Sequence, residues 1–352
     1  MPRRVSAMVA AAALFLAATP SCGSVQPPGV SSTACPAHSK TSPDSLSSTR
    51  VRDLQTDLQG HGDQNPGLEI FGAGPAAGTF SLVVGSFDSH YGWSNEFAFT
   101  VKEDGSLSPV PVARPSRRTM ATPDGNGVWN LNRSGAVNGP MTLSTTTVAF
   151  VDPQNGIHGV VLPSGPQLSA VGPNPATIES ISVGCNQTIW LAIADNSGNT
   201  DLYWLGAPSS FRAVPVALPD DGAVQHHGVQ SLSIAVAGDH LCYYRHFDSQ
   251  AQGYTNYFGC MAPDGAIKEK PDTWESPSVA LVTGPDGNAW GINDASGDTG
   301  KATILRIDSS ADSSQFNLPG FNGGEGLSEL VSADGYFWWC DDSLKLWKMS
   351  VH

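Results

Sequence analysis

A unit of two alternating segments joined by a tight turn recurs along this chain. In residues 278–290, apolar and polar positions alternate, an Asp-Gly pair follows at Asp286 and Gly287, and the second segment opens on Trp290. Alternation with a period of two predicts β-strands with one buried face, and Asp-Gly supplies the backbone angles that a tight hairpin needs. The unit recurs at residues 119–129, 180–190 and 328–338, and in divergent form at residues 231–241.

The spacing of these units predicts a closed repeat architecture. From residue 190 onward the units follow one another at intervals of about 50 residues, and a third alternating segment follows each hairpin. This period, with four short strands per unit, is typical of a β-propeller, in which each sheet packs on its neighbours. We therefore predict an all-β fold over residues 66–352, a single β-propeller of six four-stranded blades. A propeller of seven blades is the alternative. We expect the N-terminal residues 67–71 to supply the last strand and close the ring.

Residues 1–21 have the pattern of a lipoprotein-type signal peptide. Arg3 and Arg4 precede an apolar run at residues 9–18, which is too short to span a bilayer as a stable anchor. The small residue before Cys22 resembles a bacterial lipobox, in which the cysteine is acylated and becomes the new N-terminus. The alternative is ordinary cleavage nearby, which would leave Cys22 to pair with Cys35.

Residues 22–65 are rich in Ser, Pro and Thr and hold few large apolar side chains. Such a segment cannot bury enough apolar surface to offset its ordering entropy, so we interpret it as a disordered tether. The expected partner at its start is the membrane, through the lipid on Cys22. The expected location is the outer side of the cytoplasmic membrane as a lipoprotein, or the medium as a secreted protein.

Composition and charge narrow the classes of partner. The chain has a formal net charge of −14 with only 14% charged residues, so a phosphate backbone would be repelled and nucleic-acid binding is not expected. The 38 Gly and 26 Pro suit a turn-dense all-β chain, and we expect a monomer. Among the six cysteines of this exported chain, Cys242 and Cys260 lie on neighbouring strands of one expected hairpin and form the best disulfide pair.

The Gly-Pro-Asp-Gly-Asn-x-Trp unit at residues 284–290, with a His-Gly entering a preceding strand, resembles the virginiamycin B lyase (streptogramin lyase) family and its NHL- and lactonase-type propeller relatives. The resemblance implies a propeller. That family opens a cyclic depsipeptide by elimination, with His and Glu side chains at the channel mouth and a bound magnesium ion. Its acid commonly follows the repeat Trp. The matching segments at residues 129–132, 190–193 and 290–293 hold no Glu, so the resemblance predicts the architecture more specifically than the reaction.

Polar residues gather where segments enter the first strands and leave the second strands, on what we call the mouth face. Loops at a rigid rim are where function concentrates. His227 enters a first strand while Arg245 and His246 leave the second strand of the same hairpin, so the two histidines could approach each other. Histidine can take a proton in an elimination or hydrolysis, with Arg245 stabilising the developing anion. His227, Arg245 and His246 are therefore the candidate catalytic residues.

The same face supplies candidate ligand-binding residues, which are His90, Tyr91, Trp93, Arg133, Asp195, Asp294 and Asp341. Acidic loops at residues 195–200 and 293–298 carry oxygen ligands that Mg²⁺ or Ca²⁺ favours, but they lack the spacing of a calcium loop, so no metal ligand or cofactor is assigned. Two functions stay open. One is an envelope propeller that binds an extracellular ligand, peptide or glycan at its mouth face. The other is a lyase or hydrolase acting on a cyclic peptide, lactone or glycan.

Overall fold

The computed structural model describes residues 39–55, 67–73, 80–88, 92–110, 118–121, 128–131, 147–151, 157–161, 177–183, 189–195, 197, 199–205, 213–219, 231–249, 253–272, 279–293, 302–321, 330–333, 335–341 and 343–352. The elements within these ranges are the strands β1 to β24. No helix in this part of the chain is long and apolar enough to cross a membrane.

The strands form six antiparallel sheets of four strands each, which we number as blades in chain order. Blade 1 holds β2 (Gly67–Ala73), β3 (Phe80–Asp88), β4 (Gly92–Val101) and β5 (Leu107–Val110). Blade 2 holds β6 (Arg118–Ala121), β7 (Val128–Leu131), β8 (Thr147–Val151) and β9 (Ile157–Val161). Blade 3 holds β10 (Thr177–Val183), β11 (Ile189–Ala194), β12 (Thr200–Leu205) and β13 (Ala213–Val216).

The second half of the chain completes the set in the same order. Blade 4 holds β14 (Ser231–Ala237), β15 (His240–Ser249), β16 (Gly253–Met261) and β17 (Ile267–Asp272). Blade 5 holds β18 (Leu281–Thr283), β19 (Ala289–Asn293), β20 (Thr303–Ile307) and β21 (Ser313–Asn317). Blade 6 holds β22 (Val331–Ala333), β23 (Tyr336–Cys340), β24 (Lys345–Val351) and, as its outermost strand, β1 (Leu46–Asp53).

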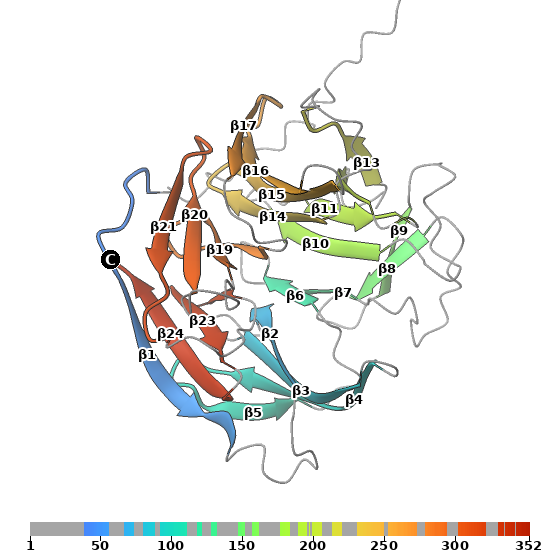
Figure 1. The fold of residues 1–352 in the computed structure, drawn as a ribbon. Coiled ribbons are helices and arrows are strands. Elements are labelled where there is room, and N and C mark those ends of the chain that lie inside the picture. The colour runs from blue at the N-terminus through green and yellow to red at the C-terminus, as the bar shows by residue number, and fades with distance from the viewer. Residues whose placement is uncertain are drawn as a thin grey trace, which may run out of the picture.

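The first strand of each blade contacts the first strand of the next. β2 contacts β6, and the contacts continue through β10, β14, β18 and β22 back to β2. Figure 1 shows the six sheets arranged around a common centre. Sheets repeated radially in this way, each meandering outward from an inner strand, define the propeller architecture. The chain is a β-propeller. The predicted all-β propeller fold is confirmed.

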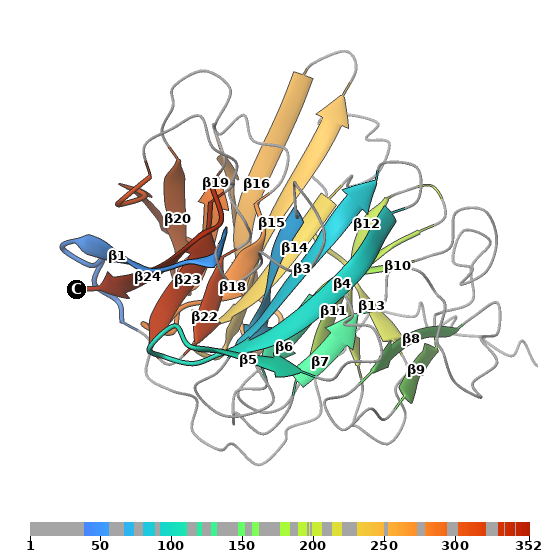
Figure 2. The ribbon, with the colours of Figure 1, turned by 90° about the horizontal axis from the view of Figure 1, so that it is seen from below.

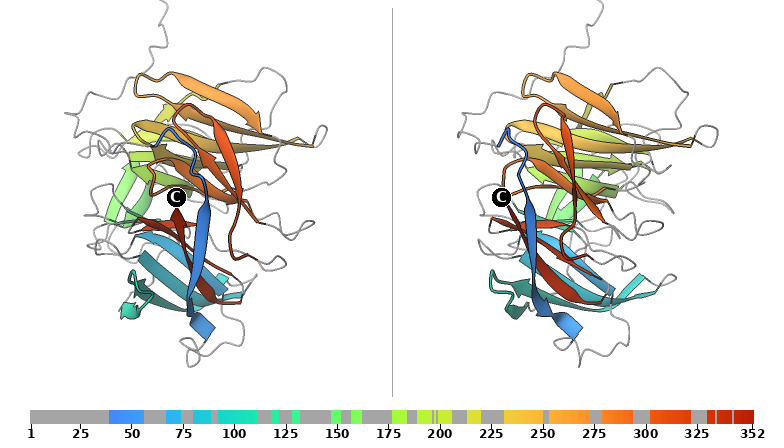
Figure 3. Two further views of the ribbon diagram at one scale, coloured as in Figure 1. Left: turned by 90° about the vertical axis from the view of Figure 1, so that its left-hand side faces the viewer. Right: turned by 60° about the vertical axis from the view of Figure 1, so that its left-hand side comes forward.

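The outer strand of blade 6 comes from the N-terminus, but from an earlier segment than predicted. β1 pairs with β24, from Leu46 opposite Val351 to Asp53 opposite Lys345, and it lies along the outside of the blade (Figures 1 and 3). The predicted residues 67–71 lie in β2, the inner strand of blade 1. Part of the predicted tether is therefore a strand. An outermost strand needs main-chain hydrogen bonds to one neighbour and little apolar surface, so its polar composition hid it.

Aromatic side chains fill the gaps between blades, as the repeat predicts. The repeat residues Trp190, Trp290 and Trp338 are buried. Trp290 of blade 5 meets Phe337 of blade 6 edge-on, with ring centroids 5.3 Å apart, and stacks on Phe316 of its own blade at 5.6 Å. A twisted sheet cannot bury both faces alone, so contacts of this kind join each blade to the next.

Hydroxyl side chains join the inner strands of neighbouring blades. Ser180 Oγ of blade 3 accepts a hydrogen bond from the Ile234 N–H of blade 4 (3.4 Å). Ser233 Oγ of blade 4 accepts from the Leu281 N–H of blade 5 (2.7 Å). An inner strand has one edge without a paired strand, and a buried N–H on that edge needs an acceptor. The two serines supply it, which ties blades 3, 4 and 5 together.

A disulfide crosses blade 4. Cys242 on β15 lies directly opposite Cys260 on β16, and their sulfur atoms are 1.99 Å apart. This is the pair that the expected hairpin favoured. Cys340 is buried in blade 6, and burial raises the pKa of its thiol.

We expect Gly320→Ala to lower the free energy of unfolding by more than Gly265→Ala. Both glycines have a positive φ (82° and 84°), a conformation that costs alanine about 1–2 kcal/mol. At Gly320 a Cβ would also lie 2.7 Å from the ring of Trp347 and 2.8 Å from Ser48 Oγ, whereas Gly265 has open space. This overpacking should cost about 1–3 kcal/mol more. Urea unfolding of both variants measures the difference, and equal losses would contradict it.

Candidate functional site

The two faces of the propeller carry different turns. In each blade the first strand begins at the mouth face and ends at the opposite face, which we call the turn face. The strands are antiparallel, so the second strand runs back to the mouth face and the third runs to the turn face again.

Two long hairpins mark the mouth face. β3 and β4 in blade 1, and β15 and β16 in blade 4, have nine or ten residues each. Every other described strand has eight or fewer. Figure 2 shows both hairpins rising on the same side of the molecule. Blades 1 and 4 lie three steps apart in the ring, so the two hairpins stand on opposite sides of the mouth (Figure 1).

These hairpins carry several of the residues predicted from the sequence. Trp93 lies in β4, paired with Phe87 of β3. His90 and Tyr91 fall between these two strands and lie outside the described residues. Arg245 and His246 lie in β15, near the mouth end of the second hairpin. The structure therefore places candidates from two distant parts of the chain on the two longest elements of one face.

Arg245 is a buried cation whose partners all come from the protein. It is 4% exposed, its guanidinium forms an ion pair with Glu269 of β17, and its Nη2 donates to the Pro219 carbonyl oxygen at 3.0 Å. The rings of Phe247 and Tyr257 lie 4.9 and 5.0 Å from its Cζ. Because the charge of Arg245 is already balanced inside the sheet, the guanidinium serves the packing of blade 4 against blade 3.

Glu269 is the centre of this buried cluster. The Tyr243 hydroxyl donates to Glu269 Oε2 at 2.6 Å while Oε1 faces Arg245. Burial, and then the hydrogen bond to Glu269, raise the pKa of Tyr243, which keeps its hydroxyl protonated as a donor. The carboxylate thus satisfies two polar groups at once, which makes their burial tolerable.

His246 lies on the other face of the same sheet, toward blade 5. It is 3% exposed, and its Nδ1–H donates to Asn256 Oδ1 at 2.6 Å. The cross-strand register continues this pair into a polar row over all four strands of blade 4: Ser231, His246, Asn256 and Asp272. The Tyr244 hydroxyl hydrogen-bonds to Asp272 from the same face, and burial raises the pKa of Tyr244. The row runs from the inner strand to the outer strand at the mouth end of the blade.

Arg245 and His246 do not share a site. Successive residues of a strand point to opposite faces, so the arginine faces blade 3 and the histidine faces blade 5. The predicted role of Arg245, stabilising an anion beside His246, does not fit this geometry. His227 lies outside the described residues, so its approach to His246 stays a prediction.

Asp195 and Asp341, both predicted to bind ligand, close their own turns instead. Each follows a second strand, and each accepts a hydrogen bond at Oδ1 from the N–H four residues later, at Asn199 (2.9 Å) and Lys345 (3.0 Å). Asp341 also accepts from Trp347 Nε1 at 2.9 Å. A short side chain that binds nearby backbone in this way is a turn-forming device. Their carboxylates are thus committed to the mouth-face turns of blades 3 and 6.

The other predicted site residues, Arg133, Asp294 and Cys22, lie outside the described residues. Within the described ranges, no group of three or more His, Cys, Asp or Glu side chains could hold a metal ion.

The site residues predicted from the sequence do not include Glu269, Asn256 and Asp272. A signal for Asn256 was available, because pairing Cys242 directly with Cys260 sets the register of β15 and β16. That register places Asn256 opposite His246. No comparable signal marked Glu269, since it meets Arg245 from two strands away.

Comparisons with known proteins found similar solved structures only at low sequence identity. No family model and no curated protein matches this chain. Virginiamycin B lyase from Staphylococcus aureus aligns over 88% of this chain and 100% of its own, with 12% identity and a TM-score of 0.45. The β-propeller domain of the Trilobed protease from Pyrococcus furiosus covers 78% of this chain and 79% of its own, at 8% identity and a TM-score of 0.41.

A luciferin-regenerating enzyme aligns over 81% of this chain and 95% of its own, with 11% identity and a TM-score of 0.43. At this level the likeness concerns the propeller architecture alone.

Replacing Glu269 alone should destabilise the protein far more than replacing Glu269 and Arg245 together. We expect Glu269→Ala to lower the free energy of unfolding by about 3–5 kcal/mol, because it leaves a buried guanidinium without its counter-charge. The double variant Arg245→Met with Glu269→Leu should recover most of that loss. Urea unfolding of the single and double variants tests this. A loss below about 1 kcal/mol for Glu269→Ala would contradict the buried-pair account.

Tyr203 of blade 3 gives a pH-dependent prediction. Burial, followed by the charges of Asp201 and Asp195, raises the pKa of Tyr203 to about 12. Its neutral hydroxyl therefore stabilises the fold fully below about pH 10, the ordinary tyrosine pKa, and this contribution is lost as the pH rises through 12. Tyr203→Phe should make the alkaline loss of stability shallower, measured as urea midpoints from pH 9 upward. Asp201→Asn should lower the pKa of Tyr203 in an ultraviolet titration, and an unchanged titration would contradict the assigned cause.

Proposed function

We propose that this chain is an exported propeller, anchored through Cys22, that binds an extracellular peptide or glycan at its mouth face. The observation that carries the proposal is the pair of long hairpins, β3–β4 and β15–β16, which rise on one face from opposite sides of the ring (Figure 2). Elements placed in this way can contact an extended ligand from both sides. Of the residues predicted to bind ligand, Trp93 lies in β4, and His90 and Tyr91 fall between β3 and β4 in the sequence.

The second hairpin is well suited to be a rigid wall. Its two strands are joined by the Cys242–Cys260 disulfide, and the ion pair of Arg245 with Glu269 ties it to β17. Binding to a rigid element loses less conformational entropy than binding to a mobile loop. The half-buried ring of Tyr257, packed edge-on against Phe247 at 5.8 Å, supplies an aromatic surface on this hairpin.

The alternative function, a lyase or hydrolase, is favoured by one observation. His246, a residue type that can transfer protons near neutral pH, lies at the mouth end of blade 4, where its Nδ1 is 2.6 Å from Asn256 Oδ1. Propellers with known reactions, such as virginiamycin B lyase, share the overall architecture. Fold alone does not decide between binding and catalysis.

A binding and turnover screen separates the two functions. The full chain is tested against immobilised glycans, cyclic peptides and lactones, with mass spectrometry of each compound after incubation. We expect saturable binding without turnover, reduced at least tenfold in the variant His90→Ala with Tyr91→Ala. Lys268→Ala, at an exposed position of the outer strand β17, is the matched control and should bind as the parent does.

Turnover that His246→Ala abolishes would replace the binding function by the enzymatic one. Binding that is unchanged by the His90 and Tyr91 substitutions would remove the hairpin of blade 1 from the site.

A further inference from the structure

The N-terminal segment of the described chain, residues 39–53, crosses from one face of the propeller to the other. We call it the strap. It begins at the turn of blade 5, where the Ser39 N–H donates to the Asp286 carbonyl oxygen at 3.0 Å. It then becomes β1, whose first residue Leu46 pairs with Val351 near the C-terminus.

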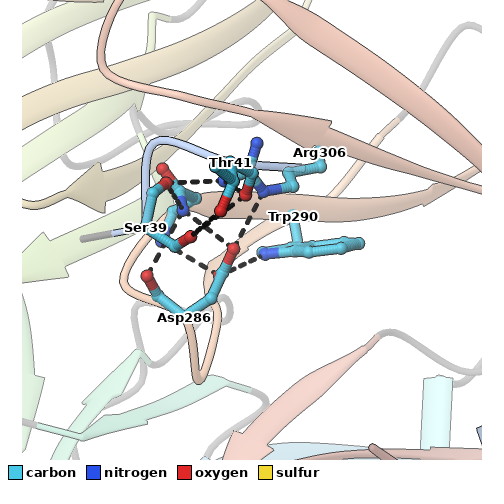
Figure 4. A network of polar contacts seen from close by, with 6 residues as sticks. Ser39, Thr41, Asp286, Trp290 and Arg306 are labelled. Carbon is cyan, nitrogen blue, oxygen red and sulfur yellow. Dashed lines mark hydrogen bonds and ion pairs between the residues drawn. The ribbon is translucent and has the colours of Figure 1, made fainter. Parts of the chain in front are cut away.

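Buried side chains of blade 5 hold the main chain of the strap. Arg306 Nη2 donates to the carbonyl oxygens of Ser39 (2.7 Å) and Thr41 (3.2 Å), and Asn288 Nδ2 donates to that of Ser39 (3.0 Å). Arg306 is 2% exposed and Asn288 is fully buried. Figure 4 shows Arg306 reaching toward Ser39 and Thr41. Hydrogen bonds from a charged donor to a buried acceptor are among the strong ones in proteins.

Asp286 organises these donors. Its carboxylate accepts from Arg306 Nε at 2.8 Å, from Trp290 Nε1 at 2.7 Å and from Asn288 Nδ2 at 2.8 Å (Figure 4). The side chains around the repeat turn of blade 5 thus bind the main chain of residues 39–41. We call Asp286, Asn288, Trp290 and Arg306 the strap site.

Blades 5 and 6 carry different basic residues opposite the repeat tryptophan. Arg306 lies opposite the repeat residue Trp290, and in blade 6 the residue opposite Trp338 is Lys348. Lys348 bonds to Glu103 of blade 1 at 3.2 Å. Equivalent positions in neighbouring blades thus bind two different parts of the structure.

Further contacts hold the rest of the strap against three blades. Ser48 Oγ donates to the Pro319 carbonyl oxygen after blade 5, and Arg52 Nη1 donates to the Gly105 carbonyl oxygen of blade 1 at 3.3 Å. The Leu54 N–H, just past the strap, donates to the Leu344 carbonyl oxygen of blade 6 at 2.8 Å. The strap therefore joins blades 5, 6 and 1, where the last blade of the ring meets the first.

The direction of the strap decides where the tether meets the propeller. β24 is a third strand and runs from the mouth face to the turn face, so the antiparallel β1 runs from the turn face toward the mouth face. β2, the first strand of blade 1, starts at the mouth face. Without the strap, a tether would join the ring at Gly67 on the mouth face. With it, the tether joins at Ser39 on the opposite face.

We propose that the strap orients the anchored protein, so that the mouth face points away from the membrane. The inference rests on the proposed anchor at Cys22 and binding mouth. Ser39 lies seventeen residues after Cys22, and a random coil of that length would span about 25 Å. This short tether draws the turn face toward the bilayer and leaves the two long hairpins on the far side.

Fluorescence quenching on vesicles tests the orientation. The lipidated full chain, with Cys35 and Cys185 replaced by Ser, carries a probe at Ser249→Cys on the mouth hairpin or at Pro263→Cys on the turn face of the same blade. It is placed on phosphatidylethanolamine and phosphatidylglycerol vesicles that contain a headgroup-nitroxide lipid. We expect at least twofold stronger quenching at position 263 than at position 249.

Release of the strap should abolish this difference. Ser39→Pro removes the N–H that bonds to Asp286, whereas the control Ser39→Ala keeps it. Faster trypsin cleavage at the exposed Lys40 and Arg50 reports that the strap has been released. If the proline does not release it, the double variant Arg306→Gln with Asn288→Ala takes its place. The quenching ratio should fall toward one in the released variant and stay at the parent value in Ser39→Ala.

The outcomes separate the strap from the anchor. A parent ratio near one on vesicles, or an unchanged ratio after trypsin-verified release, overturns the orienting role alone. If the parent and Cys22→Ser chains both stay off the vesicles, the lipid anchor is refuted, and with it the proposed location and the orientation.

Discussion

Each blade of this propeller has two faces to cover, and it can cover neither by itself. Every blade therefore depends on its neighbours, and the inner strand β22 of the last blade contacts the inner strand β2 of the first. Two kinds of contact cover the faces and edges of neighbouring blades. One is the packing of Trp290 on Phe337, and the other is the set of serine-to-backbone hydrogen bonds between inner strands. The strap makes the most extensive contacts of this kind, because it completes blade 6 and also binds blades 5 and 1.

The interior of blade 4 shows how a polar sequence can still pack as a blade. Arg245 and His246 are both buried, yet each has a partner from a neighbouring strand, Glu269 for one and Asn256 for the other. Burial of an unpaired charge would cost several kcal/mol, at an order of magnitude, so the partners are conditions for the fold. The consequence for function is that Arg245 is removed from the candidate site, while His246 and the residues of the hairpin of blade 1 stay in it.

Aspartates carry out two different tasks on this scaffold. Asp195 and Asp341 close mouth-face turns by accepting backbone hydrogen bonds, and Asp264 does the same on the turn face. Asp286 also sits in a turn, but its carboxylate is bonded by Arg306 and Trp290, and it arranges the donors that hold the strap. An acidic residue in a propeller loop is thus a poor sign of a ligand site until its own hydrogen bonds are known.

The amino-acid sequence predicts the repeating hairpins, their tight turns, the burial of the repeat tryptophans and the pairing of Cys242 with Cys260. These features depend on residues close together in the chain, where alternation and turn chemistry act directly. Three features could not be predicted in this way: residues 46–53 complete the last blade, Glu269 pairs with Arg245, and Arg306 binds the backbone of Ser39. The reason is that these contacts join residues from separate strands or opposite ends of the chain. Their energy depends on burial and on facing partners, which a pattern along one strand does not contain.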